Sequence, residues 1–343
     1  MRKLASLSIL AAALAFLLAA CGTPLAPVSS VDDVHTPAVG PGLTTSALSD
    51  WSADGDLTVE VIGDGLGNSN SGLNNATIVI PNPENVVKVY VQVVTKAGTS
   101  GEGTYPDPES VQIIAYDAVA AEIGNKTFTD DAVANDTVDR VDIASEGGGS
   151  GTTGWSHETD FVGEVAEVEV NISANATAAF PNSPRALIVS VFRDLGDGTS
   201  SAGAVPNLYV FGLDGYPTGE RTIGLPADFA GGNVTVTFAI SDLELLSSAS
   251  NFTANDPRII RYSASAGGVD ANDEIDMPNE GADLAIVQLV LPNVPASATE
   301  LTAQVYSPHP DDATPHGDSV YFNTVSVTVE TAEEGGTEGC TPG

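Results

Sequence analysis

The chain has 343 residues, of which 46 are Asp or Glu and only 11 are Lys or Arg, so its formal net charge is −35. Nucleic acid is excluded as a natural partner, because phosphate binding needs clustered cations. Hydrophobic residues make up 42% of the chain. That share supports packed cores and excludes wholesale disorder, which combines high charge with low hydrophobicity. At roughly 100–200 residues per domain, we expect two or three domains.

The N-terminus has the pattern of a secretory signal peptide. A positively charged start precedes an apolar, uncharged stretch over residues 4–20, which is a little short for a membrane-spanning helix. The stretch ends in Leu18-Ala19-Ala20-Cys21, which resembles the lipobox of bacterial lipoprotein precursors. The resemblance implies that residues 1–20 are removed and that a diacylglycerol is attached to the sulfur of Cys21. The alternative is an ordinary signal peptide followed by a chance cysteine.

The lipobox resemblance also implies a location and a partner. Membrane lipid joined through acylated Cys21 would hold the mature protein in the cell envelope, because two or more acyl chains anchor stably. In a cell with two membranes, the absence of Asp after the cysteine resembles sorting to the outer membrane. Residues 21–50 are rich in Pro, Ser, Thr, Ala and Gly and predict a flexible tether. Residues 331–343 predict a disordered tail. The tail contains Cys340, for which the sequence indicates no role.

From residue 51 onward, apolar and polar residues alternate with the two-residue period of half-buried β-strands. Clear examples are residues 87–93, 166–172, 234–238 and 325–329. In each of them we expect the apolar residues to face a core and the polar residues to face solvent. Helix signals are scarce, so the sequence predicts an all-β protein.

Three Pro-Asn turns suggest an internal repeat. They lie at residues 81–82, 181–182 and 292–293, and their prolines are 100 and 111 residues apart. This spacing is close to the roughly 100 residues of an immunoglobulin-like sandwich. A chance recurrence of Pro-Asn in a proline-rich β protein is the alternative.

The repeat predicts tandem immunoglobulin-like β-sandwich modules after the signal peptide and tether. Their expected bounds are residues 51–175 for module 1, 176–255 for module 2 and 256–330 for module 3. Module 3 lacks a later pair of strands. It could therefore share a sheet with module 2, which would make two domains instead of three.

An acidic segment late in the chain is a candidate calcium loop. Asp270, Asn272, Glu274 and Asp276 place oxygen-bearing side chains at alternate positions, and calcium takes six to eight oxygen ligands. The segment lacks the glycine and the distal glutamate of an EF-hand loop. Asp, Asn and Gly are also the ordinary residues of turns, and we favour that interpretation for any single loop.

A second candidate is a zinc site at His309, His316 and Asp318, which gathers two of the four histidines beside a carboxylate. Imidazole and carboxylate groups are zinc ligands. The string at residues 309–312, His-Pro-Asp-Asp, is similar to a zinc-deacetylase signature, but that signature follows an early strand of an α/β domain. A solvated hairpin loop is the favoured alternative here.

No catalytic constellation is indicated, because the chain has no Gly-x-Ser-x-Gly elbow for a serine nucleophile. Paired carboxylates of a glycoside hydrolase stay open, since so many acidic residues form accidental pairs. We expect a lipid-anchored cell-envelope surface protein with a structural, adhesive or binding role through its sandwich loops. Its partner would be an envelope protein or a glycan. The alternative is a secreted hydrolase or a carbohydrate-binding accessory protein.

Overall fold

The computed structural model describes residues 57–66, 75–100, 103–105, 110–129, 140–143, 151–173, 184–196, 199–211, 219–226, 229–241, 259–276, 284–306 and 319–330. These residues form antiparallel strands and one short 3-10 helix, η1 (Pro83–Asn85). The all-β prediction is therefore confirmed. Each strand segment expected from the sequence overlaps an observed strand.

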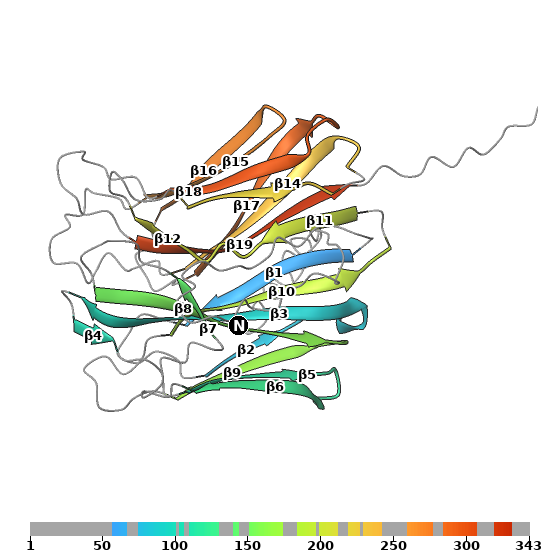
Figure 1. Ribbon diagram of the computed structural model, residues 1–343. Helices are drawn as coiled ribbons and strands as arrows, with labels where there is room; N and C mark the ends of the chain where they lie inside the picture. The colour runs from blue at the N-terminus through green and yellow to red at the C-terminus, as the bar shows by residue number, and fades with distance from the viewer. Residues whose placement is uncertain are drawn as a thin grey trace, which may run out of the picture.

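Four sheets are stacked in layers, and we number them from the bottom of Figure 1. Sheet 1 contains, in order across the sheet, β2 (Asn75–Val79), β9 (Glu167–Ser173), β5 (Ser110–Tyr116) and β6 (Glu122–Thr129). Sheet 2 contains β1 (Leu57–Gly65), β10 (Pro184–Asp194), β3 (Val86–Ser100), β8 (Gly151–Val162) and β7 (Arg140–Ile143), and β4 (Gly103–Tyr105) pairs with β3.

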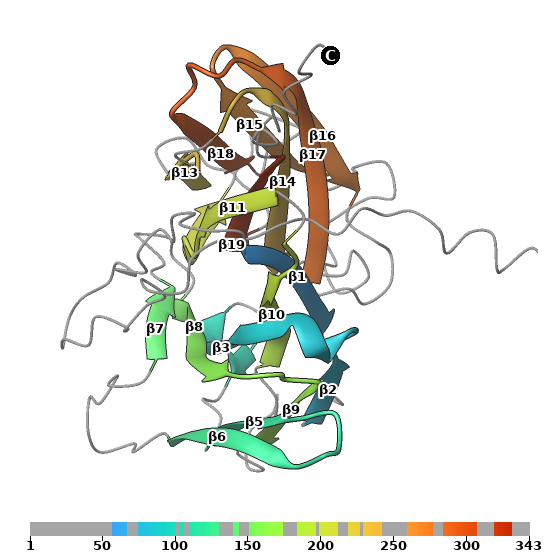
Figure 2. The ribbon, with the colours of Figure 1, turned by 90° about the vertical axis from the view of Figure 1, so that its right-hand side faces the viewer.

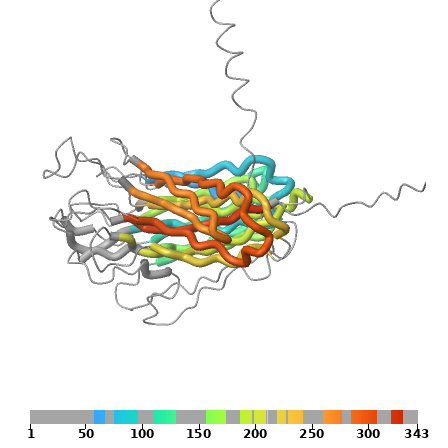
Figure 3. Tube along the Cα trace, turned by 90° about the horizontal axis from the view of Figure 1, so that it is seen from above, coloured from blue at the N-terminus to red at the C-terminus, as the bar shows by residue number. Residues whose placement is uncertain are grey.

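The upper two layers repeat this plan. Sheet 3 contains β11 (Thr199–Ala204), β19 (Ser319–Glu330), β14 (Gly232–Ser241) and β17 (Leu284–Val294), and β12 (Leu208–Phe211) pairs with β19. Sheet 4 contains β13 (Gly219–Gly224), β18 (Glu300–Tyr306), β15 (Ile259–Ala266) and β16 (Val269–Asp276). Figure 2 shows the same stack turned by 90°, and in Figure 3, seen from above, the strands of the stacked sheets share a common direction.

Each pair of sheets is a jelly roll. If the eight main strands of a pair are numbered in chain order, one sheet runs 1-8-3-6 and the other 2-7-4-5, which is the jelly-roll arrangement of an eight-stranded double sheet. Sheets 1 and 2 form the first roll and sheets 3 and 4 form the second roll. An immunoglobulin-like sandwich joins its strands in a different order. The expectation of immunoglobulin-like modules is therefore corrected to two jelly rolls.

The expected module bounds change for the same reason. A boundary at residue 175 would separate β10 from β1 and β3, its neighbours in sheet 2. Strands from the expected modules 2 and 3 alternate within sheet 3, and β13 of module 2 joins three strands of module 3 in sheet 4, which is the sharing of sheets that the two-domain alternative described. The described strands thus divide near residues 195–198, between β10 and β11, into two units instead of three.

The Pro-Asn turns do not mark equivalent positions. Asn82 follows the second strand of the first roll, whereas Asn293 lies in the sixth main strand of the second roll. Both have left-handed backbone conformations, with φ of 48° and 57°, which asparagine tolerates. The turn at residues 181–182 lies outside the described residues. Pro81 follows the end of β2, whereas Pro292 lies at a register shift in the pairing of β17 with β14, which resumes at Val294. Proline is tolerated in both settings because neither needs its missing N–H. The recurrence therefore reflects local turn chemistry, and the repeat lies in the strand order.

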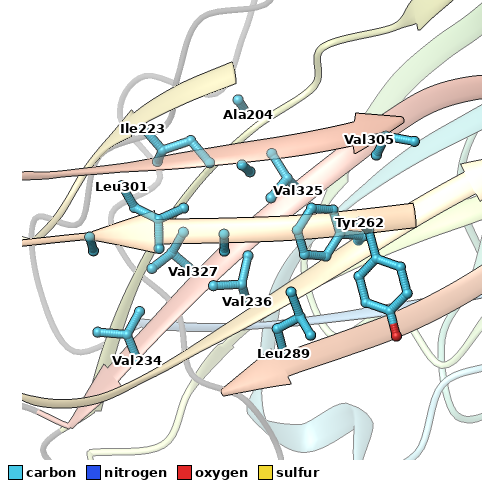
Figure 4. Packing of buried hydrophobic residues seen from close by; sticks show 14 of the residues in the cluster. Ala204, Ile223, Val234, Val236, Tyr262, Leu289, Leu301, Val305, Val325 and Val327 are labelled. Atoms are coloured by element: carbon cyan, nitrogen blue, oxygen red, sulfur yellow. The ribbon is translucent and has the colours of Figure 1, made fainter. Parts of the chain in front are cut away.

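Each roll has its own apolar core. The core of the second roll draws side chains from both of its sheets, including Val236, Tyr262, Leu301 and Val327 (Figure 4). In the first roll, Val89, Val91 and Val93 of β3 face the core shared with sheet 1. The core-facing residues of these strands are thus the apolar residues of the alternating pattern in the sequence.

A third buried layer joins the two rolls through sheets 2 and 3. Its apolar members come from both sheets and from the connection between β11 and β12: Val59, Val61, Tyr90, Val94, Ala186, Ile188, Phe192, Val205, Ala239 and Tyr321. Sheet 2 is therefore covered on both faces, and the polar residues Lys88 and Gln92 of β3 are buried, at 3% and 0% exposure. The expectation that these polar positions face solvent is wrong, because a second sandwich lies against them.

The two rolls are oriented in the same way: in each of them the first strand begins and the last strand ends at the same end of the stack. Leu57, where β1 begins, pairs with Asp194 at the end of β10, and Thr199 at the start of β11 pairs with Glu330 at the end of β19. We call this the proximal end. The opposite, distal end is where β3, β6, β16 and β18 finish, and the chain segments that connect strands there lie outside the described residues.

Candidate functional site

The expected calcium ligands lie on an edge strand. Asp270, Asn272, Glu274 and Asp276 belong to β16, at one edge of sheet 4. Alternate side chains of a strand share a face but lie roughly 7 Å apart, whereas calcium ligands surround one ion at about 2.3–2.6 Å. The expectation of a loop here is wrong, because extended backbone spreads these oxygens along a line. Glu274 instead forms an ion pair with Arg261, at 2.6 Å.

The other expected sites lie outside the described residues. This holds for His309, His316 and Asp318, the zinc candidates, and for Cys21, the lipidation candidate. Across the described ranges, no three His, Cys, Asp or Glu side chains gather closely enough to hold a metal ion. Over the same ranges, no helix has the length and apolar character needed to cross a membrane.

A buried carboxylate between the two rolls is the most distinctive polar group of the described residues. Glu158 of β8 is 5% exposed. Its Oε1 accepts hydrogen bonds from Asn207 Nδ2 at 2.6 Å and from Gln92 Nε2 at 3.5 Å. Its Oε2 accepts a hydrogen bond from the hydroxyl of Tyr90. Asn207 belongs to the second roll, so one of these bonds crosses between the rolls.

Gln92 makes two further bonds across the same layer. Its Nε2 donates to Oδ1 of Asn207 at 3.2 Å, and its Oε1 accepts from the hydroxyl of Thr324 in β19. We call Tyr90, Gln92, Glu158, Asn207 and Thr324 the inter-roll cluster. The apolar contacts around it are non-directional, whereas its hydrogen bonds require specific geometry. The cluster therefore adds directional contacts between the rolls to the apolar ones.

Strand register explains how the cluster forms. Gln92 of β3 lies directly opposite Glu158 of β8, and Tyr90, two residues before Gln92, shares its face of the sheet. Asn207 sits between β11 and β12 with a left-handed φ of 43°. Asparagine is one of the few residues other than glycine that adopts this conformation readily.

Burial dominates the electrostatics of the cluster. Removal from water raises the pKa of Glu158, although hydrogen bonds from Ser156, Tyr90, Asn207 and Gln92 oppose that change. Burial, followed by the nearby Glu158 carboxylate, raises the pKa of Tyr90 well above its usual range. Tyr90 therefore stays a neutral phenol that donates a hydrogen bond.

An ion pair lies beside the cluster on the same face of sheet 2. Lys88 Nζ is 2.6 Å from Oδ2 of Asp160, and the two side chains are 4% and 42% exposed. Asp160 is two residues from Glu158 on β8, so it shares that face. The half-exposed carboxylate is thus neutralised by a buried cation.

Several buried hydroxyl and amide groups of the layer have no hydrogen-bond partner among the described residues. They include Oγ of Ser190, Oγ of Ser326 and Nδ2 of Asn323. Ordered water is the usual partner of such groups in protein interiors. The layer between the rolls is thus partly polar, in contrast with the two apolar cores.

The geometry suits orientation better than catalysis. A catalytic carboxyl group must reach a substrate atom, but both oxygens of Glu158 are engaged by side chains of the protein itself. A buried carboxylate with this many donors fixes the groups around it. The sequence predicted none of the cluster, because the alternation placed polar residues such as Gln92 toward solvent and no motif singled out Glu158 or Asn207.

No family model matches the chain, and no curated protein matches it. Solved structures that resemble it include PNGase F, a glycosylasparaginase from Flavobacterium meningosepticum, at 10% identity, with 79% of this chain and 96% of that chain covered and a TM-score of 0.31. A chain of Sulfolobus turreted icosahedral virus has 10% identity, 80% and 90% coverage and a TM-score of 0.24. VP2 of infectious bursal disease virus has 11% identity, 86% and 74% coverage and a TM-score of 0.23. Likeness at this level assigns neither activity nor partner.

The raised pKa of Glu158 predicts a specific dependence of stability on pH. Because folding raises this pKa above its ordinary value, the contribution of Glu158 to stability is fully present below the unfolded-state pKa and is lost as pH rises through the folded-state pKa. The free energy of unfolding of the wild type, minus that of Glu158→Gln, should therefore fall as pH rises from mildly acidic values. Urea unfolding of both proteins over a pH series measures this difference.

The subtraction isolates Glu158 from the general effect of a charge of −35. The charged or titratable groups that face it are Tyr90, Lys88 and Asp160 of sheet 2, and its partners Asn207 and Thr324 in the second roll are neutral. Tyr90 stays neutral over this range, and both variants retain the Lys88 ion pair. A difference that is flat or that rises with pH would contradict a raised pKa for Glu158.

Proposed function

We propose that this protein is a lipid-anchored component of the cell envelope that binds an envelope protein or a glycan through the distal end of its two jelly rolls. The anchor is an acylated Cys21 inserted in a membrane, the outer membrane where the cell has two. The role is structural or adhesive. The two rolls present binding surfaces and perform no chemistry on the partner.

The observation that carries the proposal is that the first strand of the described chain begins at the proximal end of the rolls, opposite the distal end. The described chain enters at Leu57, which lies at the proximal end beside Asp194. A tether of residues 21–50 would reach the body at this end, and about 30 such residues span on the order of 30 Å as a coil. The strands that flank the connecting segments of the distal end then point away from the lipid.

Two physical features support binding at that end. Connections between strands carry recognition more often than the strands that position them. The buried layer between sheets 2 and 3 holds the two rolls together, so that their distal ends form one composite surface. A partner that touches both ends would gain from this preorganisation.

Changing Cys21 to alanine tests the anchor. In the native host, the wild type should carry a mass increment of attached lipid and partition into a detergent phase. The Cys21→Ala variant should lack both properties, because no sulfur remains to hold the lipid. Intact-mass analysis and detergent phase partition measure the outcome, and Cys340→Ala serves as the control that should behave like the wild type. An unmodified thiol at residue 21 in native material would overturn the anchor.

Blocking one end at a time tests the binding surface. Thr129 is exposed at the distal end of β6, and Val119 is 82% exposed in the proximal turn before that strand. A bulky polymer attached to Thr129→Cys, in a chain with Cys21→Ser and Cys340→Ser, should abolish retention on isolated envelope fractions. The same polymer on Val119→Cys should leave retention unchanged. Equal loss in both, or retention in both, would contradict a distal binding surface.

A further inference from the structure

The contact between Glu158 and Asn207 lies at a mechanically important position. Asn207 immediately precedes β12, a strand of four residues that pairs with the first residues of β19. The start of β19 and the end of β12 both lie toward the distal end of the second roll. Whatever holds Asn207 therefore also positions β12.

The hold on Asn207 comes from the first roll. Its Nδ2 donates to Glu158 at 2.6 Å and its Oδ1 accepts from Gln92 at 3.2 Å, so both ends of its amide are engaged. Glu158 and Gln92 are in turn fixed by register, as directly opposed residues of β8 and β3. Asn207 is 4% exposed, and its backbone adopts the left-handed conformation. The Asn207 amide therefore forms its hydrogen bonds with Glu158 and Gln92 in a single arrangement.

We propose that Glu158 is a positioning residue that acts as a latch: through Asn207 it holds β12 of the second roll against the first roll and fixes the separation of their distal ends. The alternative is that apolar packing alone sets the orientation, with the cluster tolerated inside it. Buried polar groups specify register in some proteins and not in others. The two cases make different predictions for a substitution that replaces the hydrogen-bond donor of Asn207 with an acceptor of the same shape.

The latch is relevant to binding only if the proposed function is correct, but it can be tested without any partner. Spin labels on Thr129→Cys of the first roll and Tyr306→Cys of the second roll report the distance between their distal ends. Both residues are exposed and lie at that end, in the outermost sheets 1 and 4. Three sheet spacings of about 10 Å separate these sheets, which suits pulsed electron paramagnetic resonance. The full chain carries Cys21→Ser and Cys340→Ser, so that only the introduced cysteines are labelled.

Asn207→Asp places a second carboxylate against Glu158 with almost no change in shape. At alkaline pH both carboxylates are ionised and repel one another, so the single narrow distance of the parent should be lost in favour of a broad or split distribution. Acidification should restore the narrow distance, because the two groups can then share a proton. A second substitution, Glu158→Gln, should restore it at alkaline pH by reversing donor and acceptor.

Two further variants guard the interpretation. Thr328→Val removes a buried hydroxyl that lies 3.1 Å from that of Ser201 within sheet 3, and it should leave the distance unchanged. If Asn207→Asp does not fold, Thr324→Val takes its place in the test. This variant removes the partner of Gln92 Oε1 and should broaden the distribution of distances. The proposal is overturned if Asn207→Asp keeps the parent distance at alkaline pH, or if Glu158→Gln fails to restore it. Failure of envelope binding leaves these distances unaffected, so the two proposals are tested separately.

Discussion

Replacing Arg193 with methionine is expected to lower the free energy of unfolding by about 3–5 kcal/mol, the range for removing one partner of a buried ion pair. Arg193 lies on β10 with its side chain 2% exposed. Its guanidinium donates to Glu60 at 3.0 Å and to the backbone carbonyls of Pro81 and Asn82 at 2.7 and 2.8 Å. Methionine fills similar space but leaves these three acceptors without their donor.

Arg261 provides the matched control. It forms an ion pair with Glu274 at 2.6 Å, but the two side chains are 52% and 44% exposed. Arg261→Met should therefore cost less than about 1 kcal/mol, as exposed pairs do. Urea unfolding of both variants compares them directly. Equal losses would show that the carbonyls held by Arg193 find water when the arginine is gone.

The strands of this fold could be predicted, but their order could not. Alternation marked residues 87–93 and 234–238 as strands because side chains on opposite faces of a strand meet different environments. Strand order depends on which segments pair across long stretches of chain, as β1 does with β10. Two-residue periodicity contains no information about that pairing. The immunoglobulin-like expectation rested on spacing alone, and spacing is shared by several β-sandwich arrangements.

The contact between the rolls was missed because one kind of alternation has two causes. In β9 the polar positions are Glu167 and Glu169, and they are only partly buried. In β19 the corresponding positions carry Thr324, Ser326 and Thr328, which are buried. In a chain with 46 acidic residues, a polar face without a single charge is itself a signal of burial, since charged side chains rarely enter interiors unpaired.

The candidate site was hidden from the sequence for a related reason. Glu158 and Asn207 are ordinary residues among many acidic and amide side chains, and only the stacking of sheet 2 on sheet 3 brings them to within 2.6 Å. The expectation of a loop at residues 270–276 was wrong for a different reason. Oxygen side chains at every second position suggested convergence on an ion, but in β16 the same spacing lines them along one face of an extended strand.

Truncating Phe238 tests whether the two rolls unfold as one unit. Phe238 of β14 is fully buried in the core of the second roll. The centroid of its ring lies 5.4 Å from that of Tyr262 and 5.9 Å from that of Phe322. Phe238→Ala should cost about 3–5 kcal/mol through lost burial and the cavity left behind. The next residue, Ala239, packs into the layer that faces the first roll. Loss of the second-roll core should therefore also expose sheet 2.

Native-state amide exchange distinguishes the possible outcomes. If the rolls form one cooperative unit, Phe238→Ala should lower protection in β18 of the second roll and in β5 of the first roll by similar factors. Val290→Ala, at a side chain that is 53% exposed on β17, should change stability by no more than about 0.5 kcal/mol. Loss of protection confined to β18 would mean that the buried layer between the rolls docks two independent units. In that case the inter-roll cluster would orient rolls that fold on their own, and its hydrogen bonds would contribute to docking alone.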